Sequence, residues 1–424
     1  MFETLKNAWK IADLRKKLLY TLFIIVIFRV GCHIPVPYLD PETISGLFSN
    51  NGNLLGYLNV LTGGALSDAT VFAMGIGPYI TASIIIQLLA IAIPAWEQLS
   101  KEGEAGRKKL ERITRYATVI LAFIQALALY LTLKSNNALE KTGWFVATVV
   151  ILTFMAGAML VMWLGEQIDK KGIGNGISMI LFAGILAGGP KVVIYFWQLL
   201  SLGQVKYYIL VPVIIILFIL IIAFIVLITN AERRIPVQYA KRVVGRKMYG
   251  GQASNIPLKV NMSGVMPIIF ASSLMAIPGT IGAFVKTTEG SFWDKFFKLF
   301  EYTNWLYATL FFILIVAFNY FYVAIQYNPI EIANNLRKNN GGIPGIRPGK
   351  PTSDFITKVL NKITLMGGLF LGIMAILPII LGAITKVNIA LGGTTVMIIV
   401  GVALDTVREL ESQMMMRHYK GFLE

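Results

Sequence analysis

The chain has 424 residues, of which 56% are hydrophobic and 14% charged, and it carries a net charge of +16. Soluble domains carry about 25% charged residues, so this composition excludes a water-soluble globular fold and indicates an integral membrane protein. With a single cysteine, Cys32, the chain cannot hold an internal disulfide framework.

Ten apolar runs are long enough to cross a bilayer, which takes about 20 residues of helix. The first run follows five basic residues, as in a signal peptide, but no small-residue cleavage site comes after it. We therefore expect an uncleaved first span. Gly75, Gly77 and Pro78 interrupt the beginning of the second run. The predicted spans lie at about 18–37, 71–94, 113–133, 143–165, 175–198, 207–229, 263–285, 303–326, 362–383 and 390–411.

Basic residues collect on one side of these spans. Of the 38 Lys and Arg residues, 28 fall in the two terminal segments and in the connections after spans two, four, six and eight, whereas 8 fall in the other connections. Because cytoplasmic segments carry the excess of Lys and Arg, this pattern predicts both termini in the cytoplasm. Five spans in each half, 1–198 and 199–424, would give the two halves inverted orientations.

The first external connection, residues 33–70, has an unusual composition. It contains no Lys or Arg, and it includes a glycine-rich, moderately apolar stretch over 54–66 that is too short to span a bilayer. One interpretation is an ordinary folded external loop. The other is a re-entrant segment, since irregular backbone at membrane depth needs protein or a water-filled cavity around it.

Two long cytoplasmic connections, 230–262 and 327–362, are basic. The second contains a turn rich in Pro and Gly over 341–350, which should hold Arg347 at a rigid tip. Positive charge that enforces topology explains most of the lysines. The length of the loops favours docking to an anionic partner such as lipid headgroups, ribosomal RNA or an acidic protein face.

Residues for catalysis or metal binding are not evident. His33 and His418 are predicted at opposite membrane faces, and the glycine run 172–176 lacks the Lys-Ser/Thr pair of a phosphate-binding loop, so we interpret it as a turn that caps the fifth span. We predict no enzymatic activity and no cofactor. A small-solute transporter is the alternative on span count alone, but transporters usually carry ionisable groups near the midplane, and here Arg29, Asp405 and Glu409 lie toward span ends. A structural or lipid-binding membrane protein would explain the basic loops but not the irregular beginning of the second span.

Several motifs, in this order on a chain of ten spans, resemble the SecY family, whose members form the pore of the bacterial protein translocase. They are Gly63 to Ser67, Phe72 to Ser83, Lys101 to Arg107, Trp163 to Gln167, Gly172 to Ser178, Pro257 to Asn261, Pro344 to Gly349 and Gly392 to Thr394. The resemblance implies an all-α polytopic membrane protein of about ten helices, with two inverted five-helix halves around an hourglass pore. It would pass unfolded polypeptides across the bacterial plasma membrane and release apolar segments into lipid.

The resemblance also implies roles for individual residues. A plug over about 56–70 would include Asn59, Leu61, Gly63, Gly64 and Leu66, and the pore ring would consist of Ile76, Ile80, Ile177, Leu181, Ile269 and Ile398. Ile76 and Ile80 share one helix face, as do Ile177 and Leu181. A girdle of branched apolar side chains can seal a pore by excluding water from it. For each ring residue considered alone, the alternative is an ordinary packed contact between helices.

By the same resemblance, a lateral gate between spans two and three and spans seven and eight would be lined by Thr81, Gln87, Gln125, Ser272, Ser273 and Ile277. Polar contacts between helices in lipid are worth about 1 kcal/mol each, weak enough to break when a signal helix enters; static interhelical bonds are the alternative for the two glutamines. Lys241, Arg242, Arg246, Lys247 and Arg347 would dock the ribosome or the SecA motor ATPase. The other implied partners are SecE, SecG, signal peptides, nascent chains and anionic lipid.

Overall fold

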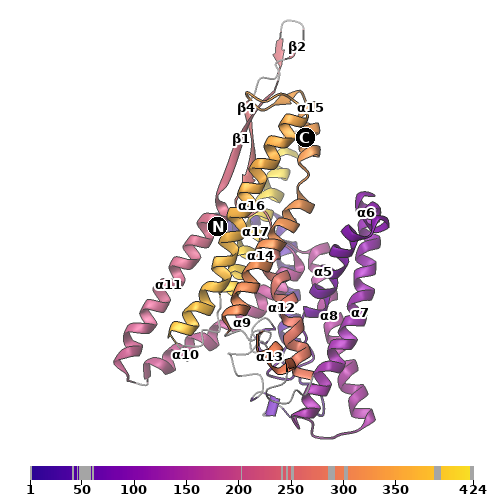
Figure 1. The fold of residues 1–424 in the computed structure, drawn as a ribbon, viewed down its shortest axis with the longest axis vertical. Coiled ribbons are helices and arrows are strands. Elements are labelled where there is room, and N and C mark those ends of the chain that lie inside the picture. The colour runs from indigo at the N-terminus through magenta and orange to yellow at the C-terminus, as the bar shows by residue number, and fades with distance from the viewer. Residues whose placement is uncertain are drawn as a thin grey trace.

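A computed structural model describes residues 2–40, 43–44, 46, 59, 62–201, 203–239, 242–244, 247–249, 253–284, 292–299, 304–385 and 393–420. Within these ranges the protein is a bundle of long helices with a small β ribbon at one end (Figure 1).

Each predicted span coincides with a helix or a pair of helices. The long helices are α2 (Ala12–Gly31), α5 (Gly77–Ala92), α7 (Glu104–Ser135), α8 (Trp144–Lys171), α9 (Gly176–Ala187) with α10 (Gly189–Ser201), α11 (Val205–Asn230), α12 (Met266–Phe284), α14 (Trp305–Gln326), α16 (Lys350–Thr385) and α17 (Gly393–Lys420). By length and composition, six helical segments among the described residues could cross a membrane: α7, α8, α9 with α10, α11, α14 with the helix after it, and 350–377 of α16.

Several predicted spans have different limits in the structure; the first, for example, ends at Gly31, and the third begins at Glu104. The fifth is two helices, because the chain breaks at Gly188 and Gly189 and Pro190 has no N–H to continue the backbone ladder. The ninth begins at Lys350 rather than at about 362. Its first turns bury Thr352, Ile356 and Leu360 one turn apart, so an amphipathic extension continues directly into the span. The predicted boundary between halves, at 198/199, falls in the last turn of α10.

The basic connection after α11 forms β structure, which the sequence analysis did not predict. β1 (Glu232–Tyr239) pairs antiparallel with β4 (Ala253–Lys259), and β5 (Gly341–Gly342), from the other basic connection, pairs with the end of β1. β2 (Arg242–Val244) and β3 (Lys247–Tyr249) form a hairpin at the far end of the molecule (Figure 1). Ile235 and Val237 of β1 are buried against α15 (Pro329–Lys338), α16 and the turn after β5. The two basic connections, for which the sequence predicts the cytoplasmic side, therefore form one unit, which is called the cytoplasmic unit after that prediction.

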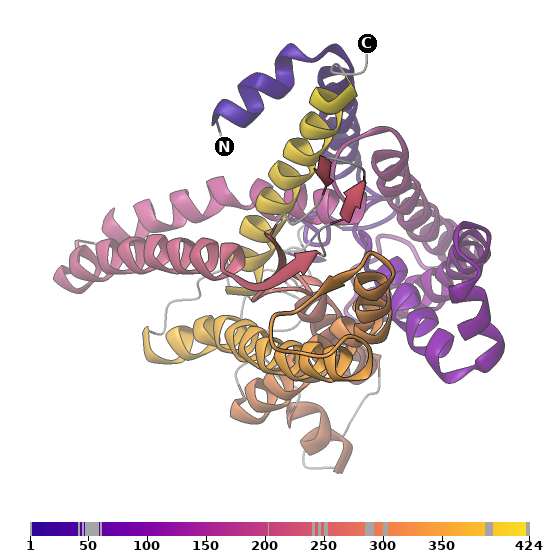
Figure 2. The same ribbon diagram turned by 90° about the horizontal axis from the view of Figure 1, so that it is seen from above.

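Shorter helices lie at the ends of the bundle. α1 (Phe2–Lys10) packs on the C-terminal part of α17, where the Thr4 hydroxyl donates to the Glu411 carboxylate over 3.1 Å (Figure 2). α6 (Pro94–Lys101) follows α5 and packs on α7, and α13 (Phe292–Leu299) follows α12. α10 and α11 contact each other and project from the side of the bundle (Figures 1 and 2).

The main hydrophobic core lies where the two halves of the chain meet. It joins residues of α2, α5, α8 and α9 to residues of α11, α12, α14, α16 and α17. A second, smaller core lies in the first half alone, between the external connection 36–73 and helices α7 and α8. The predicted ring lies in the first of these cores, and the predicted plug rests on both.

Candidate functional site

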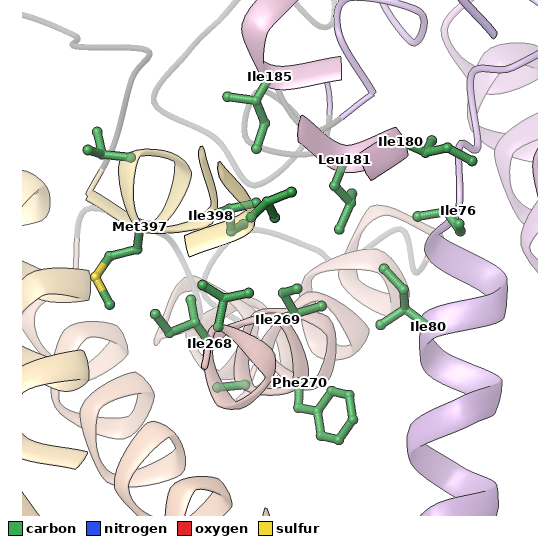
Figure 3. Close-up of a cluster of buried hydrophobic side chains, with 14 of the residues drawn as sticks. Ile76, Ile80, Ile180, Leu181, Ile185, Ile268, Ile269, Phe270, Met397 and Ile398 are labelled. Carbon is green, nitrogen blue, oxygen red and sulfur yellow. The ribbon is translucent and has the colours of Figure 1, made fainter. Parts of the chain in front are cut away.

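A small cavity lies in the main core, between the two halves of the chain. Its volume is about 70 Å³. Five of the six predicted ring residues line it: Ile76 and Ile80 at the beginning of α5, Leu181 of α9, Ile269 of α12 and Ile398 of α17. Figure 3 shows these five side chains directed toward a common space. Ile177 is half-buried against the same core and does not line the cavity.

Local structure explains how these side chains converge. Ile76 caps α5, Pro78 occupies its first turn, and Ile80 follows one turn after Ile76. Asn175 caps α9, with its side-chain oxygen accepting from the Ser178 N–H over 3.1 Å, which confirms the predicted turn at 172–176. Leu181 then faces the cavity from the second turn of α9.

The cavity wall is mostly apolar. The five ring side chains that line it are each no more than 8% exposed. The polar groups on the wall are the hydroxyls of Thr62, Ser272 and Ser273. A cavity of this size can hold water, but an apolar wall offers water few hydrogen-bond partners. The arrangement can therefore close a passage by dewetting.

The cavity wall also includes Gly77 of α5, Ser272 and Ser273 of the predicted gate, and two residues from irregular backbone. Thr62 reaches the cavity from the external connection, and Met74 lies in the turn before α5. The sequence signal for both was weak, because neither lies on a regular helix whose periodicity would assign it to a face. Their position on the wall depends on how the chain folds between 62 and 76.

The predicted plug is a run of tight turns over residues 62–69, which lies beside the cavity. Gly63 and Gly64 adopt left-handed backbone angles, with φ of 69° and 91°. Asn59 organises the turns: its backbone oxygen accepts from the Gly64 N–H over 2.8 Å, and its side-chain oxygen accepts from the Ser67 N–H over 2.9 Å. Leu66 is buried in the second core. Leu61 lies outside the described residues.

The tip of this segment touches α9. A Cβ on Gly63 would lie 2.7 Å from the carbonyl oxygen of Gly184, so glycine is required there by both space and backbone angle. The root of the segment is paired with the strand-like stretch after α2: the Val36 N–H donates to the Ala69 carbonyl over 2.9 Å, and the Val71 N–H to the Ile34 carbonyl over 3.0 Å. The described residues 62–71 thus lie against α9 and the stretch after α2.

The predicted lateral gate lies on a contact between the halves, where α12 packs against α5 and α7. Thr81, Gln87 and Gln125 are half-buried, Ser272 is buried, Ser273 is half-buried on the cavity wall, and Ile277 is 38% exposed.

Three of the polar gate residues bond within their own helices rather than across this contact. The Thr81 hydroxyl donates to the Gly77 carbonyl, the Gln87 amide to the Ser83 hydroxyl, and the Ser272 hydroxyl to the Ile269 carbonyl, over 3.1, 3.1 and 2.9 Å. The expectation that they bridge the helices is therefore wrong for these three. Each finds an acceptor within one helical turn, so separating α12 from α5 would leave these three bonds intact.

The cytoplasmic unit presents the predicted docking residues in two turns. Arg347 is exposed in the turn between β5 and α16, where Gly345 and Gly349 have left-handed backbones and the Thr352 hydroxyl donates to the Arg347 carbonyl over 2.8 Å. This agrees with the predicted rigid tip. Arg242 and Lys247 belong to the β2–β3 hairpin, in which Arg242 pairs with Tyr249 and Val244 with Lys247. Lys241 and Arg246 lie outside the described residues.

α17 links the end of α11 to the turn before α9. Arg408 donates to the Thr229 carbonyl and the Asn230 side chain at the end of α11, each over 2.8 Å. The Glu409 carboxylate accepts from the Gly174 N–H over 3.1 Å. Burial, and then the nearby Arg408 guanidinium, lower the pKa of Lys259 at the base of β4. Sequence reasoning missed these links, because the groups are far apart in the chain.

Comparison with known proteins agrees with this geometry. The family model named SecY matches residues 70–407. The chain is 43% identical to the protein translocase subunit SecY of Streptomyces scabiei, over the full length of both chains. The chain belongs to the SecY family.

Solved channel structures share the SecY-family fold. One is a SecY channel whose plug domain is described as stabilising the closed state and maintaining a membrane seal; it has a TM-score of 0.64 and 21% identity, and covers 94% of this chain and 92% of its own. Another is Sec61 in a canine ribosome–channel complex from the endoplasmic reticulum, with a TM-score of 0.62, 20% identity and the same coverage. The all-α channel fold inferred from the motifs is thus confirmed.

Proposed function

We propose that this chain is the channel-forming subunit of a protein translocase, which conducts unfolded polypeptides across the membrane and releases apolar segments sideways into lipid. The observation that supports this most directly is the small apolar cavity walled by Ile76, Ile80, Leu181, Ile269 and Ile398, which come from both halves of the chain. The protein is a channel and not an enzyme, as its family membership indicates. Membership also decides against a small-solute transporter.

The six predicted ring residues would act as a gasket. Branched apolar side chains exclude water and ions at rest and can move apart around a passing chain of any sequence, which a site built from specific polar contacts could not do. Ile177 would join the ring when α9 moves, since it is already half-buried beside the cavity. Residues 59–69 would be the plug, with Thr62 closing the external side of the cavity.

Lateral release would occur between α12 and the pair α5 and α7. Thr81, Gln87 and Ser272 keep their hydrogen bonds when these helices part, because their acceptors lie on the same helix. The energy to be overcome is then mainly apolar packing, which an incoming apolar helix can replace. Gln125, Ser273 and Ile277 would border the same opening.

The cytoplasmic unit would dock the partners that supply substrate. Arg347 at its rigid turn, and Arg242, Lys247, Lys241 and Arg246 in and around the β2–β3 hairpin, would contact the ribosome or SecA. The ribosome-bound Sec61 structure shows that a channel of this fold can assemble with a ribosome. SecE and SecG would be the membrane partners, and anionic lipid would contact the basic cytoplasmic face.

Both termini would face the cytoplasm of a bacterium, with the chain in its plasma membrane. The Lys and Arg distribution supports this orientation. Exposed tryptophans support the proposed positions of the bilayer interfaces along the helices, because Trp favours the interface. Trp144, Trp197 and Trp305, at the predicted external ends of α8, α10 and α14, are 87%, 73% and 76% exposed, and Trp9 of α1 is 50% exposed.

The proposal can be tested by arresting a secretory chain midway through membranes that contain this protein. Photo-crosslinkers would be placed in turn at Ile80, Ile269 and Ile398, and at the lipid-facing control Ile219 of α11, which is 60% exposed. We expect the three ring positions to label the same stretch of substrate and the control to label lipid. If the ring positions label no substrate while the control behaves normally, the assignment of the pore fails.

A further inference from the structure

One side chain from outside the plug makes a hydrogen bond to its tip. Arg29, in the last turn of α2, donates from Nη1 to the carbonyl oxygen of Gly63 over 3.4 Å. The contact is close, since a Cβ on Gly63 would lie 2.7 Å from the same nitrogen. Arg29 is half-buried, so its guanidinium, which carries only donors, is directed at a backbone acceptor and not simply extended into solvent.

The other hydrogen bonds of the described plug residues do not hold the tip to the channel wall. They run within the segment, as in the Asn59 bonds to Gly64 and Ser67, or join its root to residues 34–36. Close to the same point, the tip meets the Gly184 carbonyl of α9, which cannot donate to it. The bond from Arg29 thus connects the tip to α2, while the root is held separately.

A second cation lies near the tip without such a bond. A Cβ on Gly64 would lie 3.2 Å from Nζ of Lys191 on α10. No hydrogen bond from Lys191 is found in the described part of the chain, and this lysine therefore serves as a matched control for positive charge near the plug.

We propose that Arg29 is a positioning residue that latches the plug tip in its closed place over the ring. The proposal rests on the proposed function, because it assigns Arg29 to the plug of that channel. A hydrogen bond to a charged group stabilises one state enough to shift a two-state equilibrium by about tenfold or more. Because the bond from Arg29 is long, we take the lower end of this range, about tenfold. Loss of the guanidinium should therefore raise the population with the plug displaced about tenfold, with the root still paired.

Labelling of a plug cysteine in resting channels tests this directly. Ala65 belongs to the plug and is 1% exposed, and Cys32 can be replaced by alanine so that Ala65→Cys is the single thiol. An impermeant maleimide added from the external side should label it about tenfold faster in Arg29→Gln, with a matching rise in ion leak. Arg29→Lys, which keeps a charged donor, should restore most of the closure, and Lys191→Ala should label at the parent rate.

A second reporter separates a latch from general loosening. Ala122→Cys, at a fully buried position of α7 that belongs to neither of the two cores, should label at one rate in all these proteins. Equal labelling of Ala65→Cys with and without Arg29 overturns the proposal, and so does parallel acceleration at Ala122→Cys or an equal effect of Lys191→Ala. These measurements use no substrate. Failure of the arrested-chain crosslinks would remove the translocation function and leave the latch, whereas unchanged labelling removes only the latch.

Discussion

Two neighbouring isoleucines of α12 allow the sealing role of the cavity to be separated from ordinary packing. Ile269 lines the cavity and is 5% exposed, whereas Ile268 is fully buried in the same core and does not line it (Figure 3). Each would be replaced by alanine in turn. The two variants remove the same atoms from adjacent positions, so a difference between them reports the position and not the chemistry.

The structure sets the expected loss of stability. Truncating a packed isoleucine to alanine costs about 2 to 5 kcal/mol. For 424 residues, with an unfolding entropy of about 2.1 cal/mol/K per residue, Ile268→Ala should lower the thermal midpoint by about 2 to 6 °C. Ile269 already borders empty space and makes fewer contacts on that side. The midpoint of Ile269→Ala should therefore fall by no more than half as much.

For ion leak, the order of the two variants should be reversed, with Ile269→Ala affected more than Ile268→Ala. The present cavity of about 70 Å³ has an apolar wall, and removing the Ile269 side chain widens it where the ring closes. Water would then fill the constriction, and ions would follow. Ile268→Ala leaves the wall intact and should not leak.

The assay is single-channel current and bulk ion flux in proteoliposomes without substrate, alongside thermal unfolding in detergent. The reasoning is refuted if Ile268→Ala leaks as much as Ile269→Ala. It is also refuted if Ile269→Ala stays sealed and loses as much stability as its neighbour, because Ile269 would then be an ordinary core residue.

Three further substitutions have definite expected outcomes. Asn319→Leu should lower the thermal midpoint and leave the resting seal intact. The buried Asn319 amide donates to a carbonyl of α16 over 2.7 Å, and leaving that carbonyl unpaired costs about 1 to 3 kcal/mol. An unchanged midpoint would contradict this. Gly176→Ala should reduce the yield of folded protein, measured by gel filtration, since the added Cβ would overlap the Gly165 carbonyl oxygen; normal yield would show that α8 and α9 can separate freely. Lys259→Met should raise the midpoint at pH 7, because burial and Arg408 lower the pKa of this lysine and so penalise its charged form in the folded state. That gain should shrink as pH rises through the lowered pKa, where the folded lysine is already neutral, and a gain that grows with pH would reverse the sign of the argument.

Local sequence was sufficient to predict the parts of the fold that depend on local physics. A run of about 20 apolar residues must form a helix in lipid, since no other conformation satisfies its backbone there. All ten predicted spans therefore coincide with helices. The turn that caps α9 and the rigid turn around Arg347 were predicted for the same reason, because glycine, proline and asparagine act on their immediate neighbours.

The β ribbon and the early beginning of α16 were not predicted, because short amphipathic stretches become regular only when another segment covers them. Ile235 and Ile356 are buried in a core shared by two loops that are about a hundred residues apart in the chain. The resemblance supplied the ring and plug residues, but five ring side chains meet on one cavity only after four helices have packed.

The sequence by itself determined that this protein lies in a membrane, where its spans are and how its charge is distributed along the chain. The reason is that the free energy of transferring a residue from water to lipid depends mainly on that residue and its neighbours. Tertiary structure alone decided that Thr62 lines the cavity and Ile177 does not, that three gate residues bond within their own helices, and that Arg29 reaches Gly63. Those outcomes depend on contacts within a few ångströms between segments distant in the chain, and helix packing fixes them.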